Sequence, residues 1–183
     1  MKNICISLSF FISFSISAQH YNVLLIPDSL VKKADAVTRY EEMRIEIKSP
    51  GKASVHEKYV HTILNDDGLK YADYSARYDR FKSINSIDGI LYDGMGKELK
   101  KVKNKDILDH SAYDGISLMQ DARYKEHNFF YKEYPFTTEY EEESDLDGIF
   151  YLSDWYFQQG PYIGVQQSKL VVVTPKDYKL HYK

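Results

Sequence analysis

The chain has 183 residues, of which 15% are aromatic and 28% are charged, and its formal net charge is −3 at pH 7. This mild acidity argues against nucleic acid and anionic membranes as partners, because both attract basic surfaces. The single cysteine is Cys5, which lies in a segment that we expect to be removed. Disulfides, thiolate metal sites and cysteine nucleophiles are therefore excluded from the expected mature chain.

The first 18 residues have the pattern of a secretory leader. Lys2 supplies a positive charge, an apolar run follows it, and small residues precede Gln19, as at a cleavage site. The apolar run is too short to span a bilayer. We predict a signal peptide over 1–18, a single domain over 19–183, and a periplasmic or secreted location with no membrane insertion after cleavage.

One short helix is predicted near the start of the mature chain. Asp28 can cap its N-terminus, and Leu30, Ala34 and Val37 recur at the spacing of one helix face. We expect this helix to run from 28 to about 36 and to pack one stripe against a sheet.

The rest of the chain reads as a series of strands. Apolar and polar residues alternate with a period of two, which is typical of half-buried strands. Turn signals such as Asp67-Gly68 separate the apolar runs at a spacing of about ten residues. The sequence therefore predicts an all-β protein, an antiparallel β-sandwich with one short N-terminal helix. The expected strands are 42–48, 55–64, 71–78, 84–92, 99–102, 149–152, 155–157 and 170–174.

The stretch from 121 to 140 forms the expected centre of the sandwich, as two extended segments that meet at Pro135. Phe136, Thr138 and Tyr140 alternate with polar residues, whereas 129–131 is apolar on both faces. Such a segment is expected deep between two sheets.

Arg123 is a candidate ligand-binding residue. On a strand it points the same way as Asp121, so the two could form a partly buried ion pair that fixes the register. A role for Arg123 in holding a ligand is the alternative.

The segment 104–120 shows no clear period and predicts a long loop. Its Asp109, His110 and Asp114 could act as an oxygen–nitrogen metal cluster or as the carboxylates of a hydrolase. A solvated turn is the commoner explanation of such a pattern. No Gly-x-Ser-x-Gly nucleophile motif occurs in the sequence.

Two further groups are candidates for binding. Glu139, Glu141 and Asp145 share one strand face and form a weak calcium candidate, with a solvated sheet face as the alternative. Tyr156 and Tyr162 flank Gly160-Pro161 and are the expected exposed aromatic platform, whereas the neighbouring tryptophan and phenylalanine have the pattern of a core strand. No cofactor is expected.

Several segments spread over nearly the whole mature chain match a known family in the family's order: 30–37, 65–68, 93–97 with Leu99, 121–123, 140–143, 154–158 and 170–175. Through these segments the chain resembles the uncharacterised β-sandwich domain at the N-terminus of exported bacterial transglutaminase-like proteins. The resemblance implies an accessory module, because the papain-like catalytic domain that follows it in that family, with its cysteine, histidine and aspartate, is not in this sequence. The resemblance supplies no catalytic residue.

The alternation of Tyr178, Leu180 and Tyr182 predicts a further strand at the end. We expect the chain to be the N-terminal part of a longer protein and to be non-catalytic. Its partner is either the following catalytic domain or a protein or glycan ligand. A carbohydrate-binding module and a carboxylate-dependent hydrolase are the alternative functions.

Overall fold

The computed structural model describes residues 21–112, 121–149, 152 and 154–178. The described chain forms two β-sheets, which confirms the predicted all-β sandwich. The strands are β1 (Ala36–Ser49), β2 (Lys52–Ile63), β3 (Tyr74–Tyr78), β4 (Lys82–Tyr92), β5 (Glu98–Lys101), β6 (Leu108–Ser111), β7 (Arg123–His127), β8 (Phe136–Asp147), β9 (Ile163–Val165) and β10 (Ser168–Val173). The helical pieces are η1 (Val23–Leu25), α1 (Asp28–Val31), η2 (Asp66–Tyr71) and η3 (Asn104–Asp106).

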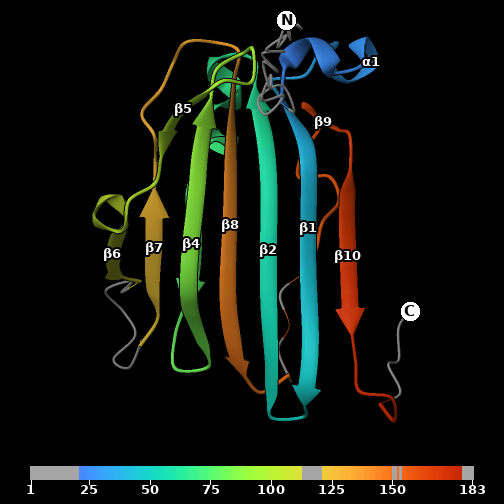
Figure 1. Ribbon diagram of the computed structural model, residues 1–183, viewed down its shortest axis with the longest axis vertical. Coiled ribbons are helices and arrows are strands. Elements are labelled where there is room, and N and C mark those ends of the chain that lie inside the picture. Colours follow the sequence, from blue (N-terminus) through green and yellow to red (C-terminus); the bar gives the residue numbers. More distant parts are fainter. Residues whose placement is uncertain (1–20, 113–120, 150–151, 153, 179–183) are drawn as a thin grey trace, which may run out of the picture.

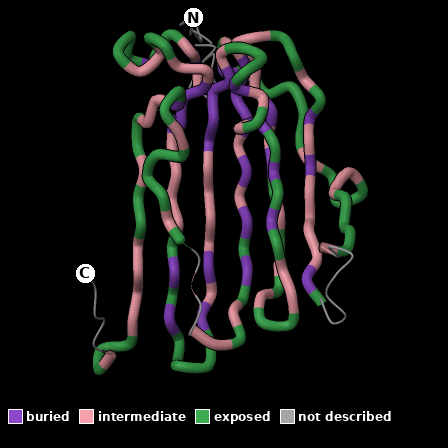
Figure 2. Tube along the Cα trace, turned by 180° about the vertical axis from the view of Figure 1, so that it is seen from behind, coloured by how far each residue is buried: buried purple, intermediate pink, exposed green. Residues whose placement is uncertain are grey.

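The large sheet has the strand order β10-β1-β2-β8-β4-β5 (Figure 1). Its central strands β1, β2, β8 and β4 are antiparallel, and their alternating side chains separate a core face from a charged face. β9 and β10 pair with successive parts of β1 in parallel, so the sheet is not purely antiparallel. Figure 2 shows the buried positions alternating along the central strands.

The small sheet, β3-β7-β6, covers part of the core face of the large sheet. Tyr74 of β3 and His127 of β7 are buried and face the large sheet, where His127 Nδ1 lies 2.7 Å from the hydroxyl of Tyr140. Gly89 of β4 is the register partner of Tyr140 and leaves room for its ring. These contacts form the larger of two hydrophobic clusters.

The described residues between β8 and β9 cover a different part of the same face, behind β1 and β2 in Figure 1. Ile149 and Leu152 pack on a second cluster around Ile45 and Val55. Further along, Gln159 hydrogen-bonds to Glu41 of β1. The core face is therefore covered by two separate elements, the small sheet and this crossing segment.

The helix prediction was too long. α1 covers Asp28–Val31, and Lys32 already has extended backbone angles. Ala36 and Val37 belong to β1, are fully buried and pair with Ile63 and Thr62 of β2. Strand pairing in the core thus overrides the helical spacing of these residues.

Three predicted strands are wrong in the described residues. Positions 129–131 form a loop, in which Phe130 has a φ of 53° and is solvent-exposed. Positions 155–157 are irregular, and neither 149 nor 152 is in a strand. The predicted loop 104–120 contains η3 and β6, while 113–120 lies outside the described residues, as do the predicted signal peptide and the predicted strand beyond 178.

No helix in the described part of the chain has the length and apolar character needed to cross a membrane.

Candidate binding site between the two sheets

Two carboxylates meet on the core face of the large sheet. Glu57 of β2 and Glu142 of β8 are register partners, and directly opposed residues in an antiparallel pair have Cβ atoms about 5 Å apart. Both lie on the same face as Tyr59 and Tyr140, the next pair along the two strands. A pair of acidic side chains on a core face needs compensation by partners or by protonation.

Glu142 is compensated by fixed partners. Its residue is 3% exposed, and it accepts a hydrogen bond of 2.6 Å from the hydroxyl of Tyr74. The ammonium of Lys82 lies 2.9 Å from its second oxygen. Burial, followed by the charge of Glu142, raises the pKa of the Tyr74 hydroxyl, so this hydroxyl remains a donor at neutral pH.

Glu57 is in a different situation. No residue in the described part of the chain forms a hydrogen bond or ion pair with its carboxylate. Burial raises the pKa of Glu57; the charge of Lys82 opposes this shift, and the charge of Glu142 adds to it. The two neighbouring carboxyl groups therefore differ in their surroundings: Glu142 is paired with Tyr74 and Lys82, and burial raises the pKa of Glu57.

Glu57 opens into a cavity of about 580 Å³, which we call the seam pocket. The pocket is bordered by β3, by Lys82 at the start of β4, and by the end of β8 where the crossing segment begins. Its volume falls in the range of small-ligand sites, about 300–1,000 Å³. The lining residues are Glu57, Ser75, Ala76, Arg77, Tyr78, Asp79, Phe81, Lys82, Leu146, Asp147 and Gly148.

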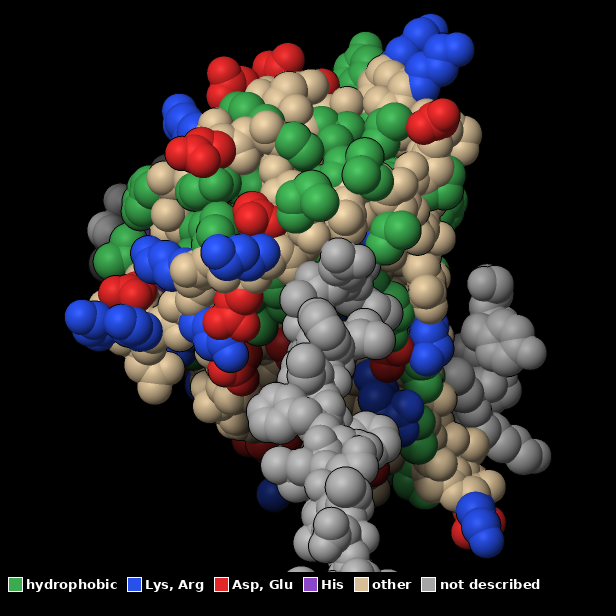
Figure 3. Space-filling view, turned by 45° about the horizontal axis from the view of Figure 1, so that its top comes forward, with side chains coloured by type: hydrophobic (Ala, Val, Ile, Leu, Met, Phe, Trp, Pro, Cys, Tyr) green, Lys and Arg blue, Asp and Glu red, His purple; other side chains and the backbone are tan. Residues whose placement is uncertain are grey.

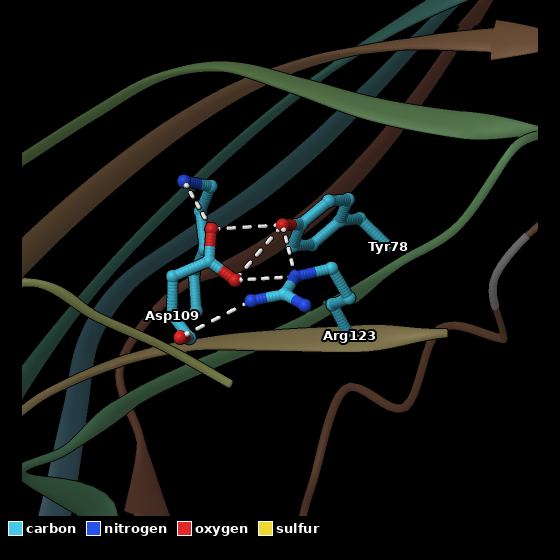
Figure 4. Close-up of polar contacts among 4 residues, drawn as sticks. Tyr78, Asp109 and Arg123 are labelled. Carbon is cyan, nitrogen blue, oxygen red and sulfur yellow. Dashed lines mark hydrogen bonds and ion pairs between the residues drawn. The ribbon is translucent and has the colours of Figure 1, made fainter. Parts of the chain in front are cut away.

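The predicted site residue Arg123 belongs to a polar network on the small sheet (Figure 4). Its Nε lies 2.8 Å from Oδ1 of Asp109 and 3.0 Å from the hydroxyl of Tyr78. Lys125 Nζ lies 3.3 Å from Oδ2 of the same aspartate. The predicted ion pair between Arg123 and Asp121 is wrong. Asp121 precedes β7, and its Oδ2 lies 3.8 Å from Nε of Arg80 instead.

The network keeps Asp109 ionised. The hydrogen bond from Tyr78 contributes most to lowering the pKa of Asp109 to about 2; burial, the next largest effect, opposes it, and Arg123 and Lys125 lower the pKa further. A carboxylate of such low basicity is a poor general base at neutral pH. Asp114, its predicted companion, lies outside the described residues.

The three residues of the weak calcium candidate, Glu139, Glu141 and Asp145, do not share one set of partners. Glu139 and Glu141 lie on the charged face of β8, and both contact the ammonium of Lys58. Asp145 instead accepts a hydrogen bond from Asn85. Among the described residues, no three histidine, cysteine or acidic side chains are arranged to hold a metal ion.

The predicted aromatic platform is exposed, with Tyr156 at 67% and Tyr162 at 57% of full accessibility. The expectation that Trp155 and Phe157 form a core strand is wrong, because this segment is irregular and Phe157 is also exposed. The ligand-binding role of the two tyrosines remains a prediction.

One end of the sandwich carries an exposed apolar surface (Figure 3). Leu24 and Met95 are exposed there, and the backbone bond from Val23 N to Gly94 O joins their two segments. Phe130, in the loop before Pro135, is 86% exposed.

Sequence reasoning missed the seam pocket. Glu57 falls between Val55 and Tyr59 in the strand alternation, and Glu142 falls between Tyr140 and Ser144. A charged residue at an expected inward position is the available signal. The pairing with Lys82 and Tyr74 depends on long-range topology, which local spacing does not specify.

The fold and the pocket define a two-sheet β-sandwich domain with a partly compensated acidic cavity between its layers. The chain belongs to the family described as "Domain of Unknown Function with solved-structure structure (DUF3857)", whose model matches residues 49–183. No curated protein matches the sequence.

Solved structures with a similar fold include a "putative protease" from Parabacteroides distasonis ATCC 8503. It has a TM-score of 0.64 and 11% sequence identity, over 78% of this chain and 29% of that chain. A "putative nutrient binding protein" from Legionella pneumophila matches with a TM-score of 0.31 and 8% identity, over 63% of this chain and 41% of that chain. The present chain therefore spans less than a third of the first structure and less than half of the second.

Proposed function

We propose that this protein is an exported, non-catalytic recognition domain that serves as an accessory part of a longer protein. The observation that carries the proposal is the match to the Parabacteroides structure, in which the shared fold accounts for 29% of a larger chain. That chain is described as a "putative protease", and the sequence resemblance points to a papain-like transglutaminase neighbour. Either neighbour would supply the chemistry, and this domain would supply binding.

Two features of the surface support recognition. The seam pocket has the size of a ligand site and contains a carboxylate without a partner among the described residues. The exposed apolar end around Leu24 and Met95 is of the kind that marks contact surfaces in soluble proteins.

The proposal is tested by assaying the purified chain 19–183 for turnover. We expect no release of labelled peptides from casein and no incorporation of a labelled amine into casein. The matched controls are Asp109→Asn and Glu57→Gln, which remove two acidic groups with shifted pKa values. Turnover by the wild-type chain that either substitution abolishes would show a catalytic domain and refute the proposal.

A carbohydrate-binding module is the second candidate. The exposure of Tyr156 and Tyr162 favours it, because exposed aromatic rings can stack on sugar faces. Affinity electrophoresis in gels containing soluble polysaccharides tests it. Retardation that disappears in the double variant Tyr156→Ala, Tyr162→Ala supports this candidate, and unchanged retardation in that variant counts against it.

A carboxylate-dependent hydrolase is less favoured. The residue expected to act, Asp109, is held as a carboxylate by Tyr78, Arg123 and Lys125, and its pKa is lowered to about 2. A general acid or base works best when its pKa lies near the working pH.

A further inference from the structure

The strand β3 has a free edge. The small sheet has the order β3-β7-β6, and β3 pairs with β7 along its whole length, Tyr74–Tyr78. In the described chain, no backbone hydrogen bond leaves positions 75–78 on the opposite edge. A strand edge of this kind presents unpaired N–H and C=O groups to any extended chain that can reach it.

This free edge borders the seam pocket. Five consecutive residues, from Ser75 to Asp79, line the cavity, and Glu57 and the end of β8 lie across from them. Because successive side chains of a strand point to opposite faces, we infer from this run of consecutive lining residues that the edge of β3, with its backbone, forms this wall. The cavity of about 580 Å³ therefore adjoins a set of main-chain donors and acceptors.

The charges of the pocket favour a cation. The ammonium of Lys82 pairs with Glu142 at 2.9 Å. Arg77, at an exposed position of β3, is the other cation among the lining residues, and Glu57, Asp79 and Asp147 outnumber it. Asp79 and Asp147 add negative charge at the rim. Glu57 is left as a carboxyl group that a positively charged ligand group could pair with.

We propose that an extended peptide adds to the free edge of β3 and places a lysine or arginine side chain against Glu57. The inference rests on the proposed function and deepens it by naming the ligand class, a basic peptide in an extended conformation. Main-chain bonds to β3 would supply affinity, and the pairing with Glu57 would supply specificity, as in other cases of strand addition.

The test uses fluorescence polarisation with a Val-Lys-Val-Lys-Val-amide peptide that carries fluorescein on its N-terminal amine, and the purified chain 19–183. We expect saturable binding, and we expect Glu57→Gln to weaken it about tenfold or more, because a charge pair in a partly buried site is lost. The matched control is Glu143→Gln, which alters an exposed residue on the opposite face of the large sheet and should leave the affinity unchanged.

Two further probes separate strand addition from capture of an amine. The same peptide N-methylated at alternate amides should bind at least about tenfold more weakly, because it cannot donate to β3. n-Butylamine should compete only at much higher concentration than the peptide. Thermal unfolding of Glu57→Gln establishes that a loss of binding is not a loss of folding.

The inference is overturned if the peptide fails to bind, if Glu57→Gln binds it as tightly as the wild type, or if N-methylation has no effect. Equal potency of n-butylamine and the peptide would replace strand addition by a simple amine site. A different outcome would refute the proposed function. Cleavage or modification of the peptide would rule out a non-catalytic role even if the peptide occupied this site.

Discussion

Gly89 shows how one small residue sets the position of a buried ring. A Cβ at this position would lie 2.6 Å from Val102 Cγ2 and 2.7 Å from Tyr140 Cδ1. Tyr140 is fully buried and is held by His127, so it has little freedom to move aside.

We therefore expect Gly89→Ala to destabilise the domain by about 1–3 kcal/mol, the usual cost of overpacking a core. Urea unfolding monitored by circular dichroism measures this change. Gly51→Ala is the matched control, because the nearest atom to its Cβ would be Ser49 Oγ at 3.9 Å. Equal stability of the two variants would mean that the core around Tyr140 is looser than described.

The raised pKa of Glu57 predicts how the stability of the domain depends on pH. Its folded pKa is raised above the ordinary value of 4.5, so the folded state binds the proton more tightly than the unfolded state. The stabilising contribution of the protonated group is complete below the ordinary pKa and is lost as the pH rises through the raised pKa. Lys82, Glu142, Glu41 and His56 are the charged groups that act on it.

The melting temperature of Glu57→Gln relative to the wild type should therefore increase as the pH rises from 4 to 8, because burial opposes the ionisation of the wild-type carboxyl group. The gain should shrink towards pH 4. Melting curves of the variant and the wild type over this pH range test the sign of the difference in melting temperature. A variant that is less stable than the wild type at pH 8 would show that the ionised carboxylate is stabilised by a partner.

At the scale of elements, Asp109 connects the short strand β6 to its neighbours. It accepts from Tyr78 of β3 and from Arg123 and Lys125 of β7, so one side chain links all three strands of the small sheet. Its lowered pKa means that these links persist well into the acidic range and are lost as the pH falls through about 2.

Asp109→Asn should loosen β6 locally. We expect faster amide hydrogen exchange at Leu108–Ser111 than in the wild type, and little change in the central strands β2 and β8, which do not contact this network. Mass-spectrometric exchange at neutral pH measures both regions in one experiment. Unchanged protection of β6 would show that its backbone pairing with β7 is sufficient without the carboxylate.

The elements that the sequence predicted well are those with strict alternation. The runs around Ile45, Val55 and Phe136 each separate one apolar face from one charged face, and each is a strand of the large sheet. The failures have physical causes. Ala36 and Val37 fit a helix locally but pair with β2, and Trp155 and Phe157 alternate within a segment that has no strand partner among the described residues.

The candidate site was harder to predict than the fold. Arg123 was identified, but its partner came from β6, fourteen residues earlier in the chain. The pairing of Glu142 with Lys82 joins residues sixty positions apart across two strands. Such contacts follow from strand order, and strand order is decided by long-range packing that no short window of sequence contains.

At the scale of the whole molecule, the domain consists of one broad sheet whose core face is shared by two covering elements. The small sheet covers the part around Tyr140, and the crossing segment covers the part around Ile45. The seam pocket adjoins both, at β3 and at the start of the crossing segment. This division of the core face accounts for a cavity inside an otherwise ordinary sandwich.

The central claim is that this domain binds a ligand without transforming it. Native mass spectrometry of the purified chain mixed with the acetyl-Val-Lys-Val-Lys-Val-amide peptide tests this claim most directly, because one spectrum reports both binding and chemistry. The account predicts a one-to-one complex from which the peptide is recovered with its mass unchanged. A peptide of altered mass, produced by the wild type and not by Glu57→Gln, would contradict it.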